Sequence, residues 1–176
     1  MCWMMEGVIS HVVFAVKNSR YDWQKVKRKK PAGFIAPTFP FFEGEGEEFL
    51  INILCNTAKE LGLRFASFNF CGDHVHAVLI TENIEISKTV GLWKGKSAYL
   101  YNRRDQLVHE NSQSQKQVKV NQNLWAKSFF HKIINTAAEL DRVNNYIINN
   151  RKKHGLEPLS DSSIKIISTL FFSINQ

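Results

Sequence analysis

The segment His74-Val-His-Ala-Val-Leu-Ile-Thr81 decides the fold, because its apolar and β-branched residues predict a strand at the centre of a sheet. A second strand is predicted just before it, at Arg64–Phe70, and Cys71-Gly-Asp73 forms a tight turn between the two. The two strands therefore form a hairpin. Successive side chains of a strand point to opposite faces, so His74 and His76 share one face. The other face carries Val75, Ala77 and Leu79 and is expected to lie under helices.

The rest of the chain supplies the other elements of the fold. Working outward, the patterns predict a strand at Val8–Val16, a helix at Glu47–Leu61 ended by Gly62, a helix at Ile86–Asn102, a strand at Phe129–Ile134 and a helix from Thr136 to about Lys153. The first six elements follow the order β-α-β-β-α-β. That order predicts an α+β, ferredoxin-like fold: an antiparallel sheet with helices on one face, followed by a C-terminal helix. The other face of the sheet is then free for a site or a partner.

The length of 176 residues fits a single domain covering residues 1–176. Pro31–Gly46 holds three of the four prolines and three glycines, which predicts a loop insertion. Val108–Asn123 is polar and predicts another loop, with a short strand at Val118–Val120. Residues 157–176 form a C-terminal tail that is expected to contain a short docking helix. The apolar residues of that helix are Ile164, Ile167 and Phe171.

The composition favours a polyanionic partner and a reducing compartment. Lys and Arg number 23 against 16 Asp and Glu, a net charge of +7, and part of the excess is the run Lys25–Lys30. That run is either a solvated loop or a DNA contact. The cysteines Cys2, Cys55 and Cys71 are far apart in the sequence and do not suggest disulfides. No secretory or membrane-spanning pattern is present, so a cytoplasmic protein without membrane contact is expected.

Two histidines projecting from one strand face are half of a metal site, or simply polar residues of a strand. Cys71 offers a third, thiolate ligand for zinc, but the role of a small half-buried residue is the more ordinary one for it. Asp73 either orients the adjacent histidine or serves only the turn.

The last helix carries a second group of candidates. Thr136-Ala-Ala-Glu139 matches a capping box, which predicts where this helix begins. Tyr146 and Asn150 are four residues apart and so lie next to each other on one helical face. Leu140, Val143 and Ile147 form the adjoining buried stripe. Taken alone, Tyr146 is also compatible with a packing role and a solvated hydroxyl.

Together these segments resemble one family. Gly72–Ile80 is similar to the His-hydrophobic-His strand of the single-tyrosine HUH transposases, which include small insertion-sequence transposases and REP-associated tyrosine transposases. Four further segments resemble other parts of that family in matching order: His11–Lys17, Trp93–Ala98, Leu124–Phe130 and Tyr146–Asn150. The resemblance covers most of the chain.

The resemblance implies a role for each candidate. His74 and His76 would bind Mg²⁺ or Mn²⁺, Tyr146 would be the nucleophile, and Asn150 would be the third metal ligand. Asn rather than Gln at this position, with Lys152–Leu156 after it, is typical of the REP-associated group. Arg151 departs from that pattern, since Pro often stands there, and the long loop between Tyr21 and Glu47 departs from the compact insertion-sequence pattern.

The family's chemistry is single-stranded DNA cleavage and strand transfer through a 5′-phosphotyrosine. It needs no nucleotide cofactor, in agreement with the absence of a Walker-type glycine loop from the sequence. The expected substrate carries a DNA hairpin, and the expected assembly is a homodimer. Whether Tyr146 acts on the histidines of its own chain or of its partner is open. The general base is also open.

Several basic residues of the second helix are candidate DNA contacts: Lys94, Lys96, Arg103 and Arg104. A solvated helix face explains them equally well. Four other histidines, without a paired partner in the sequence, are expected to be structural or on the surface: His11, His109, His131 and His154. Three alternatives remain: a non-catalytic nucleic-acid-binding module with the same fold, a zinc protein, and a domesticated transposase with a cellular role.

Overall fold

The elements follow the predicted order. A computed structural model of the chain describes residues 7–17, 19, 42–82, 85–110 and 123–171, with only the backbone for 104–110. The elements are β1 (Val8–Ala15), α2 (Gly44–Glu60), β2 (Arg64–Phe70), β3 (His74–Thr81), α3 (Ile86–Glu110), β4 (Phe130–Ile133), α4 (Ala137–Lys153) and α5 (Asp161–Ser168). The β-α-β-β-α-β order predicted from the sequence is confirmed.

The four strands form one antiparallel sheet in the order β2-β3-β1-β4. The two central strands, β1 and β3, pair so that Val13 lies opposite His76 and Ala15 lies opposite His74. The hairpin between β2 and β3 turns at Gly72, whose φ of 70° lies in the left-handed region that glycine adopts without strain. The histidine pair is therefore carried by a strand that has neighbours on both sides.

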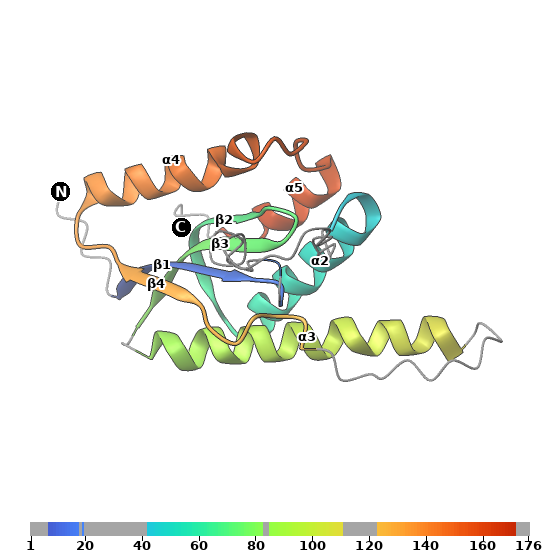
Figure 1. Ribbon diagram of the computed structural model, residues 1–176. Helices are drawn as coiled ribbons and strands as arrows, with labels where there is room; N and C mark the ends of the chain where they lie inside the picture. Colours follow the sequence, from blue (N-terminus) through green and yellow to red (C-terminus); the bar gives the residue numbers. More distant parts are fainter. Residues whose placement is uncertain (1–6, 18, 20–41, 83–84, 111–122, 172–176) are drawn as a thin grey trace, which may run out of the picture.

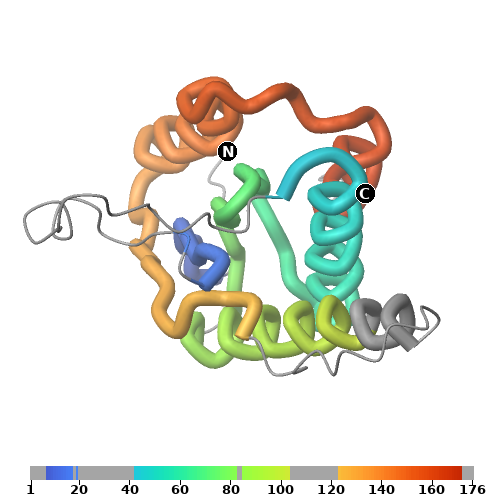
Figure 2. The backbone as a smooth tube through the Cα atoms, turned by 45° about the vertical axis from the view of Figure 1, so that its right-hand side comes forward, coloured from blue at the N-terminus to red at the C-terminus, as the bar shows by residue number. Residues whose placement is uncertain are grey.

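One face of the sheet packs on α2 and α3 and forms the main core (Figures 1 and 2). Alternate residues of the two central strands supply it: Val12, Phe14, Val75, Ala77 and Leu79. Trp93 of α3 lies wholly inside this core, and its indole nitrogen donates a hydrogen bond to the Leu54 carbonyl, 3.0 Å away. The expected ferredoxin-like α+β arrangement, with the first two helices on one face, is confirmed.

The opposite face is not free, which corrects the expectation from the sequence. Helix α4 runs across it, so the sheet lies between α4 and α3 (Figure 1). Val78, Ile134 and Ile147 form a second, smaller core there, with Leu140 and Val143 packed against it. Helix α4 lies on this face because its apolar stripe is removed from water when it packs on the nearest apolar surface, and this burial stabilises the fold.

Two helix boundaries differ from the prediction. Helix α2 begins at Gly44, so the last residues of the predicted Pro31–Gly46 loop are helical. Helix α3 continues past Asn102 to Glu110 and takes in the first residues of the predicted 108–123 loop. The segment it adds, Arg103-Arg-Asp-Gln-Leu-Val-His-Glu110, contains mostly residues of good helix propensity, which explains the extension.

The C-terminal tail contains the expected helix, α5, which packs on α2. Its docking residues were only partly predicted: Ile167 is buried, whereas Ile164 and Phe171 are 53% and 37% exposed. Leu170 is buried in place of Phe171. The predicted basic run at 25–30, the strand at 118–120 and Cys2 lie outside the described residues. In the part of the chain that the structure describes, no helix is long and apolar enough to cross a membrane.

Candidate active site

The two histidines of β3 lie buried side by side on the face that α4 covers. His74 is 1% exposed and His76 is 4% exposed, and their ring centroids are 4.9 Å apart. The strand period places them together, as expected. Since polar side chains inside a protein need partners, the groups that surround the two rings determine what they can do.

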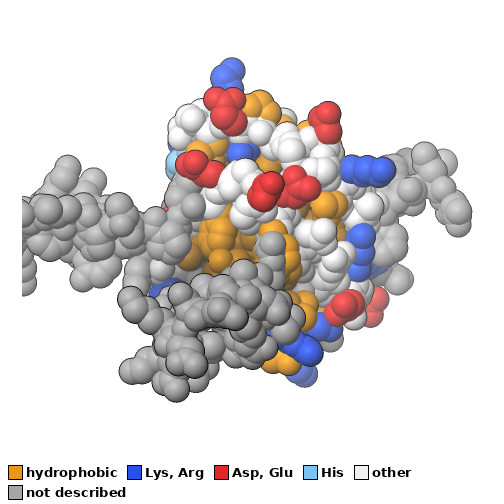
Figure 3. Space-filling model, turned by 90° about the vertical axis from the view of Figure 1, so that its right-hand side faces the viewer, with side chains coloured by type: hydrophobic (Ala, Val, Ile, Leu, Met, Phe, Trp, Pro, Cys, Tyr) orange, Lys and Arg blue, Asp and Glu red, His pale blue; other side chains and the backbone are white. Residues whose placement is uncertain are grey.

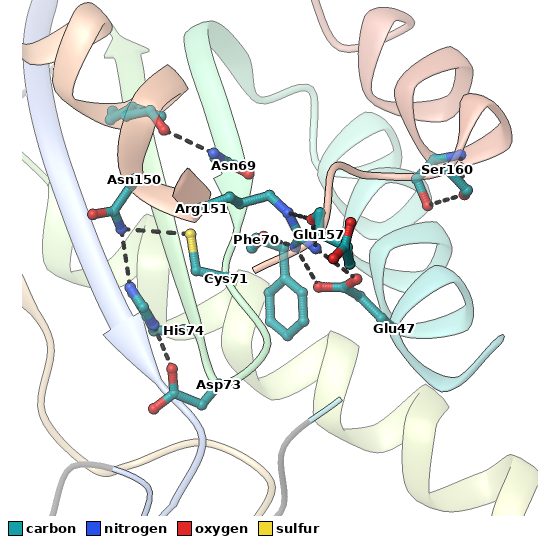
Figure 4. Close-up of polar contacts among 12 residues, drawn as sticks. Glu47, Asn69, Phe70, Cys71, Asp73, His74, Asn150, Arg151, Glu157 and Ser160 are labelled. Atoms are coloured by element: carbon teal, nitrogen blue, oxygen red, sulfur yellow. Dashed lines mark hydrogen bonds and ion pairs between the residues drawn. The ribbon is translucent and has the colours of Figure 1, made fainter. Parts of the chain in front are cut away.

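His74 is held at both of its ring nitrogens. Its Nδ1 contacts the carboxylate of Asp73, the residue before it in the hairpin turn, and its Nε2 lies 3.2 Å from Nδ2 of Asn150 (Figure 4). A carboxylate at Nδ1 places the ring proton there and leaves a lone pair on Nε2. Asp73 is thus a residue of the turn and also contacts His74, in line with its predicted role of orienting the adjacent histidine.

Asn150 reaches this histidine from α4. Its side chain is fully buried, and its Nδ2 also lies 3.4 Å from the sulfur of Cys71. Its Oδ1 is buried and accepts no hydrogen bond from any residue that the structure describes. Because amide oxygen and nitrogen are assigned from their contacts, a half-turn of this amide brings the oxygen towards His74 Nε2. A buried carbonyl oxygen beside an imidazole lone pair is a donor set that suits a divalent cation.

Tyr146 lies one helical turn before Asn150 and faces the same pair. Its ring centroid is 5.4 Å from that of His76, and the residue is 39% exposed. Nζ of Lys153 lies 5.2 Å from the centre of the tyrosine ring. Helix α4 therefore brings an accessible phenol to the histidine pair of its own chain.

Two further histidines touch the pair, and the sequence reasoning missed them. Nε2 of His11 on β1 is 3.3 Å from Nδ1 of His76, and the His154 ring centroid is 5.2 Å from that of His74. Both had been expected to be structural or on the surface. The signal for His11 was strand alternation: Val12 and Phe14 face the main core, so His11 and Val13 face the opposite side, which carries the histidine pair. For His154 the signal was its position four residues after Asn150.

Burial, and secondarily the charge of Lys132, lowers the pKa of His11 below its ordinary value. Desolvation and a nearby cation both disfavour the imidazolium. The neutral form that results carries one nitrogen lone pair, so His11 is able to accept a hydrogen bond at physiological pH.

Buried polar contacts fix α4 to the sheet and to α2 (Figure 4). Asn69 of β2 donates to the Ile147 carbonyl, 2.7 Å away. Arg151 donates to the Phe70 carbonyl at 2.8 Å and forms an ion pair with Glu47, whose shorter contact is 2.5 Å. Arg151 follows Asn150 directly, so the same contacts hold the amide in place.

The basic residues of α3 differ in burial and in the groups that they contact. Lys94 is buried, and its ammonium lies within 3.3 Å of the carbonyls of Ala126, Lys127 and Ser128. Burial also lowers its pKa. These contacts do not favour Lys94 as a DNA contact, because its donors hold the backbone that leads into β4. Lys96 pairs with Glu60, its side chain 40% exposed, and Arg103 is exposed. The side chain of Arg104 lies outside the described residues.

The end of the molecule that carries α2 and α5 is acidic. Figure 3 shows Asp and Glu side chains gathered in the upper part of this face, above an apolar area. Exposed acidic residues of these elements and of the turn before α5 include Glu43, Glu45, Glu157 and Asp161. These carboxylates repel a phosphate backbone, which disfavours DNA binding at this end.

The zinc alternative gains no support. Burial raises the pKa of the Cys71 thiol to about 11, with the Asn150 hydrogen bond opposing the rise. Zinc binding through Cys71 would have to displace the thiol proton. Within the described ranges, no three His, Cys, Asp or Glu side chains are grouped so as to hold a metal ion.

Comparison with known proteins decides the family. Residues 5–150 match the family model described as "Transposase IS200 like". The chain belongs to the IS200-like transposase family. The matched residues include the histidine pair, Tyr146 and Asn150, and the expected relationship to the single-tyrosine transposases is confirmed.

Two solved structures are similar to this chain, and the first of them has the same fold. The IS200-like chain is similar to a REP-associated tyrosine transposase bound to a REP hairpin, with a TM-score of 0.54 and 11% identity over 89% of this chain and 74% of the other. A transposase candidate from Deinococcus radiodurans R1 has 19% identity over 86% of this chain and 95% of that one, with a TM-score of 0.49. No curated protein is similar enough to count as a match.

Proposed function

We propose that this IS200-like transposase cleaves and rejoins single-stranded DNA with Tyr146 as its nucleophile. The observation that carries the proposal is the 5.4 Å separation of the Tyr146 and His76 rings, next to His74 and Asn150. A phenol at the surface beside a buried imidazole pair supplies an attacking oxygen and a place for a cation in one site.

The metal would be Mg²⁺ or Mn²⁺, held by His74, His76 and the side-chain oxygen of Asn150. Support comes from Asn150 Oδ1, which has no hydrogen-bond partner among the described residues, and from the carboxylate at His74 Nδ1, which directs the other nitrogen of that ring to Asn150. When bound, such an ion neutralises and polarises a phosphate oxygen of the scissile bond. Imidazole and amide ligands together suit Mn²⁺ well.

The tyrosine oxygen would attack phosphorus and form a phosphotyrosine with the 5′ side of the break. The bond from phosphorus to the 3′ oxygen breaks, and that oxygen leaves as a 3′-hydroxyl after taking up a proton. The phenol, with an ordinary pKa of roughly 10, loses its proton during attack. Because one phosphate ester replaces another, rejoining requires no nucleotide cofactor.

The substrate we propose is single-stranded DNA with a hairpin near the cleavage point. One fold relative is described as bound to a REP hairpin, and Asn150 is the residue typical of the REP-associated group. Lys96 and Arg103 remain proposed phosphate contacts. A homodimer also remains a proposal, and the packing of α4 on its own sheet favours a site built within one chain.

A cellular role of the REP-associated kind is the second candidate, and Asn150 is the observation that favours it over self-transposition. The non-catalytic alternative requires aromatics on the exposed faces of the first and third strands, β1 and β3, for bases to stack on. Phe14 is only 1% exposed and faces the main core, while α4 covers the other face of the sheet. The burial of Phe14 and the position of α4 favour a catalytic function over a non-catalytic nucleic-acid-binding module.

A covalent adduct tests the proposal. The full chain is incubated with Mn²⁺ and single-stranded DNA from the flanks of its own gene, then analysed in denaturant. The wild type should form an adduct, Tyr146→Phe should form none while still binding the DNA, and Tyr99→Phe should match the wild type. Tyr99 is a suitable control because it is a 62% exposed tyrosine of α3. Adducts that persist in Tyr146→Phe would refute the assignment.

A further inference from the structure

His11 gives His76 a partner that the sequence did not suggest. Nε2 of His11 and Nδ1 of His76 are 3.3 Å apart, within hydrogen-bonding distance, and the two ring planes are inclined by only 18°. Nearly parallel rings allow the in-plane N–H of one to point at the in-plane lone pair of the other. We propose that His11 is a positioning residue: it accepts a hydrogen bond from His76 Nδ1–H and thereby directs His76 Nε2 to the metal. This inference rests on the proposed function.

The same arrangement recurs at the other histidine. Asp73 contacts Nδ1 of His74, while Nε2 of that ring lies towards Asn150. Each member of the pair is thus held at Nδ1 by an acceptor, which for His74 is the preceding residue and for His76 lies on the neighbouring strand, and this contact fixes its tautomer and its orientation. The two acceptors differ in charge. The pocket must receive a phosphate, and a second carboxylate there would repel it. The neutral imidazole of His11 orients His76 without adding such a charge.

The surroundings of His11 fix its ring. It lies on β1, between β3 and β4, where it stands opposite Val78 on one side and Lys132 on the other. The ring centroid is 5.8 Å from that of Phe130 and 6.3 Å from that of Tyr146, both nearly perpendicular to it. A ring packed edge-on against these aromatics on a central strand has little freedom to turn away from His76.

Two substitutions test separately whether His11 acts through its acceptor nitrogen or through the packing of its ring. His11→Phe keeps a flat ring and its packing but removes the lone pair, whereas His11→Gln restores an acceptor oxygen near the position of Nε2. His131→Phe is the matched control, since His131 lies on β4 opposite Val12 and so faces away from the pair. Folding of each full-length variant is checked by circular dichroism and thermal unfolding.

The measured quantity is the dissociation constant for Mn²⁺, by calorimetry on the protein alone and by Mn²⁺ titration of adduct formation. His11→Phe should weaken Mn²⁺ binding by about 10–100-fold, the usual effect of losing a partner of a metal ligand. His11→Gln and His131→Phe should stay close to the wild type, and metal-free hairpin binding should be unchanged in all three.

The outcomes separate this inference from the proposed function. Unchanged Mn²⁺ affinity in His11→Phe, with an active wild type, would overturn the role of His11 alone. Equal losses in His11→Phe and His11→Gln would show that the ring itself is needed and would also overturn the acceptor role. A wild type that forms adducts with Tyr146 but binds no Mn²⁺ would remove the metal and this inference, and would leave the nucleophile standing. A wild type that forms no adduct but binds Mn²⁺ as predicted would refute the proposed reaction only.

Discussion

At the scale of single residues, the site depends on how buried polar groups are satisfied. Asn150 is fully buried and its Oδ1 has no protein partner among the described residues, although Nδ2 contacts both Cys71 and His74. Leaving such an oxygen without a partner costs roughly 1–3 kcal/mol, so a sequence that retains it suggests another use for the amide. Metal coordination is the use that its neighbours favour.

Replacing Asn150 tests that use. Asn150→Leu keeps the volume but removes the oxygen, and it should lower adduct formation by roughly 100-fold or more, because loss of an outer partner of a metal ligand alone costs 10–100-fold. Asn149→Leu is the adjacent control, since Asn149 is exposed and its side chain donates to the Asn145 carbonyl in its own helix. Equal activity in the two variants would exclude Asn150 as a ligand.

The core of the site was predicted from the sequence, and its partners were not. Strand and helix periods place His74 with His76, and Tyr146 with Asn150, since each pair lies on one element. The contacts of His11 and His154 depend on strand register and on the crossing of α4 over the sheet, which local patterns do not contain. The burial of Lys94 was not predicted for a similar reason, because the segment whose carbonyls it bonds lies some 30 residues further on.

At the scale of elements, the position of α4 depends on Arg151. Its guanidinium pairs with Glu47 and bonds the carbonyls of Phe70 and Glu157, so three segments of the chain meet at one side chain. The guanidinium fixes the end of the tyrosine helix to α2 and β2.

Breaking this ion pair should destabilise the fold. Arg151→Leu leaves the Glu47 carboxylate buried without its partner and should lower the free energy of unfolding by about 3–5 kcal/mol. Adding Glu47→Leu should recover part of that loss, because an apolar pair replaces the unpaired charge. Arg142→Leu, at an exposed arginine of the same helix, should change stability by no more than about 0.5 kcal/mol. A double variant less stable than Arg151→Leu would contradict this reading.

Helix α3 offers a second paired comparison. Lys94→Met removes the donor shared by three carbonyls and should lower the free energy of unfolding by about 1–3 kcal/mol. Lys96→Met removes only a surface pair with Glu60 and should lower it by about 0–1 kcal/mol. Denaturant unfolding of both variants measures the difference, and the reverse order would refute the structural role of Lys94.

At the scale of the whole molecule, one chain contains every candidate group. The sheet supplies His11, His74 and His76, while α4, packed on that same sheet, supplies Tyr146 and Asn150. The sequence predicted the sheet and the helix order, because alternation and helical spacing are local. It did not predict that α4 would cover the sheet, since that depends on which apolar surface remains after α2 and α3 have packed.

A mixing experiment tests whether the site is built within one chain. His76→Ala and Tyr146→Phe are each expected to be inactive, and mixtures of the two should remain inactive, because no single chain has both a complete histidine pair and a nucleophile. Wild type diluted with Tyr146→Phe is the control and should lose activity only in proportion to dilution. Adduct formation in the mixed variants would mean that the tyrosine acts on a partner's histidines.

The central claim is that Tyr146 becomes covalently linked to DNA, and mapping the linked residue tests it most directly. The wild-type adduct is digested with trypsin and nuclease, and the peptide carrying the residual nucleotide is sequenced by mass spectrometry. The account predicts the nucleotide on Val143-Asn-Asn-Tyr-Ile-Ile-Asn-Asn-Arg151, in which Tyr146 is the sole tyrosine. A nucleotide attached to any other residue would contradict it.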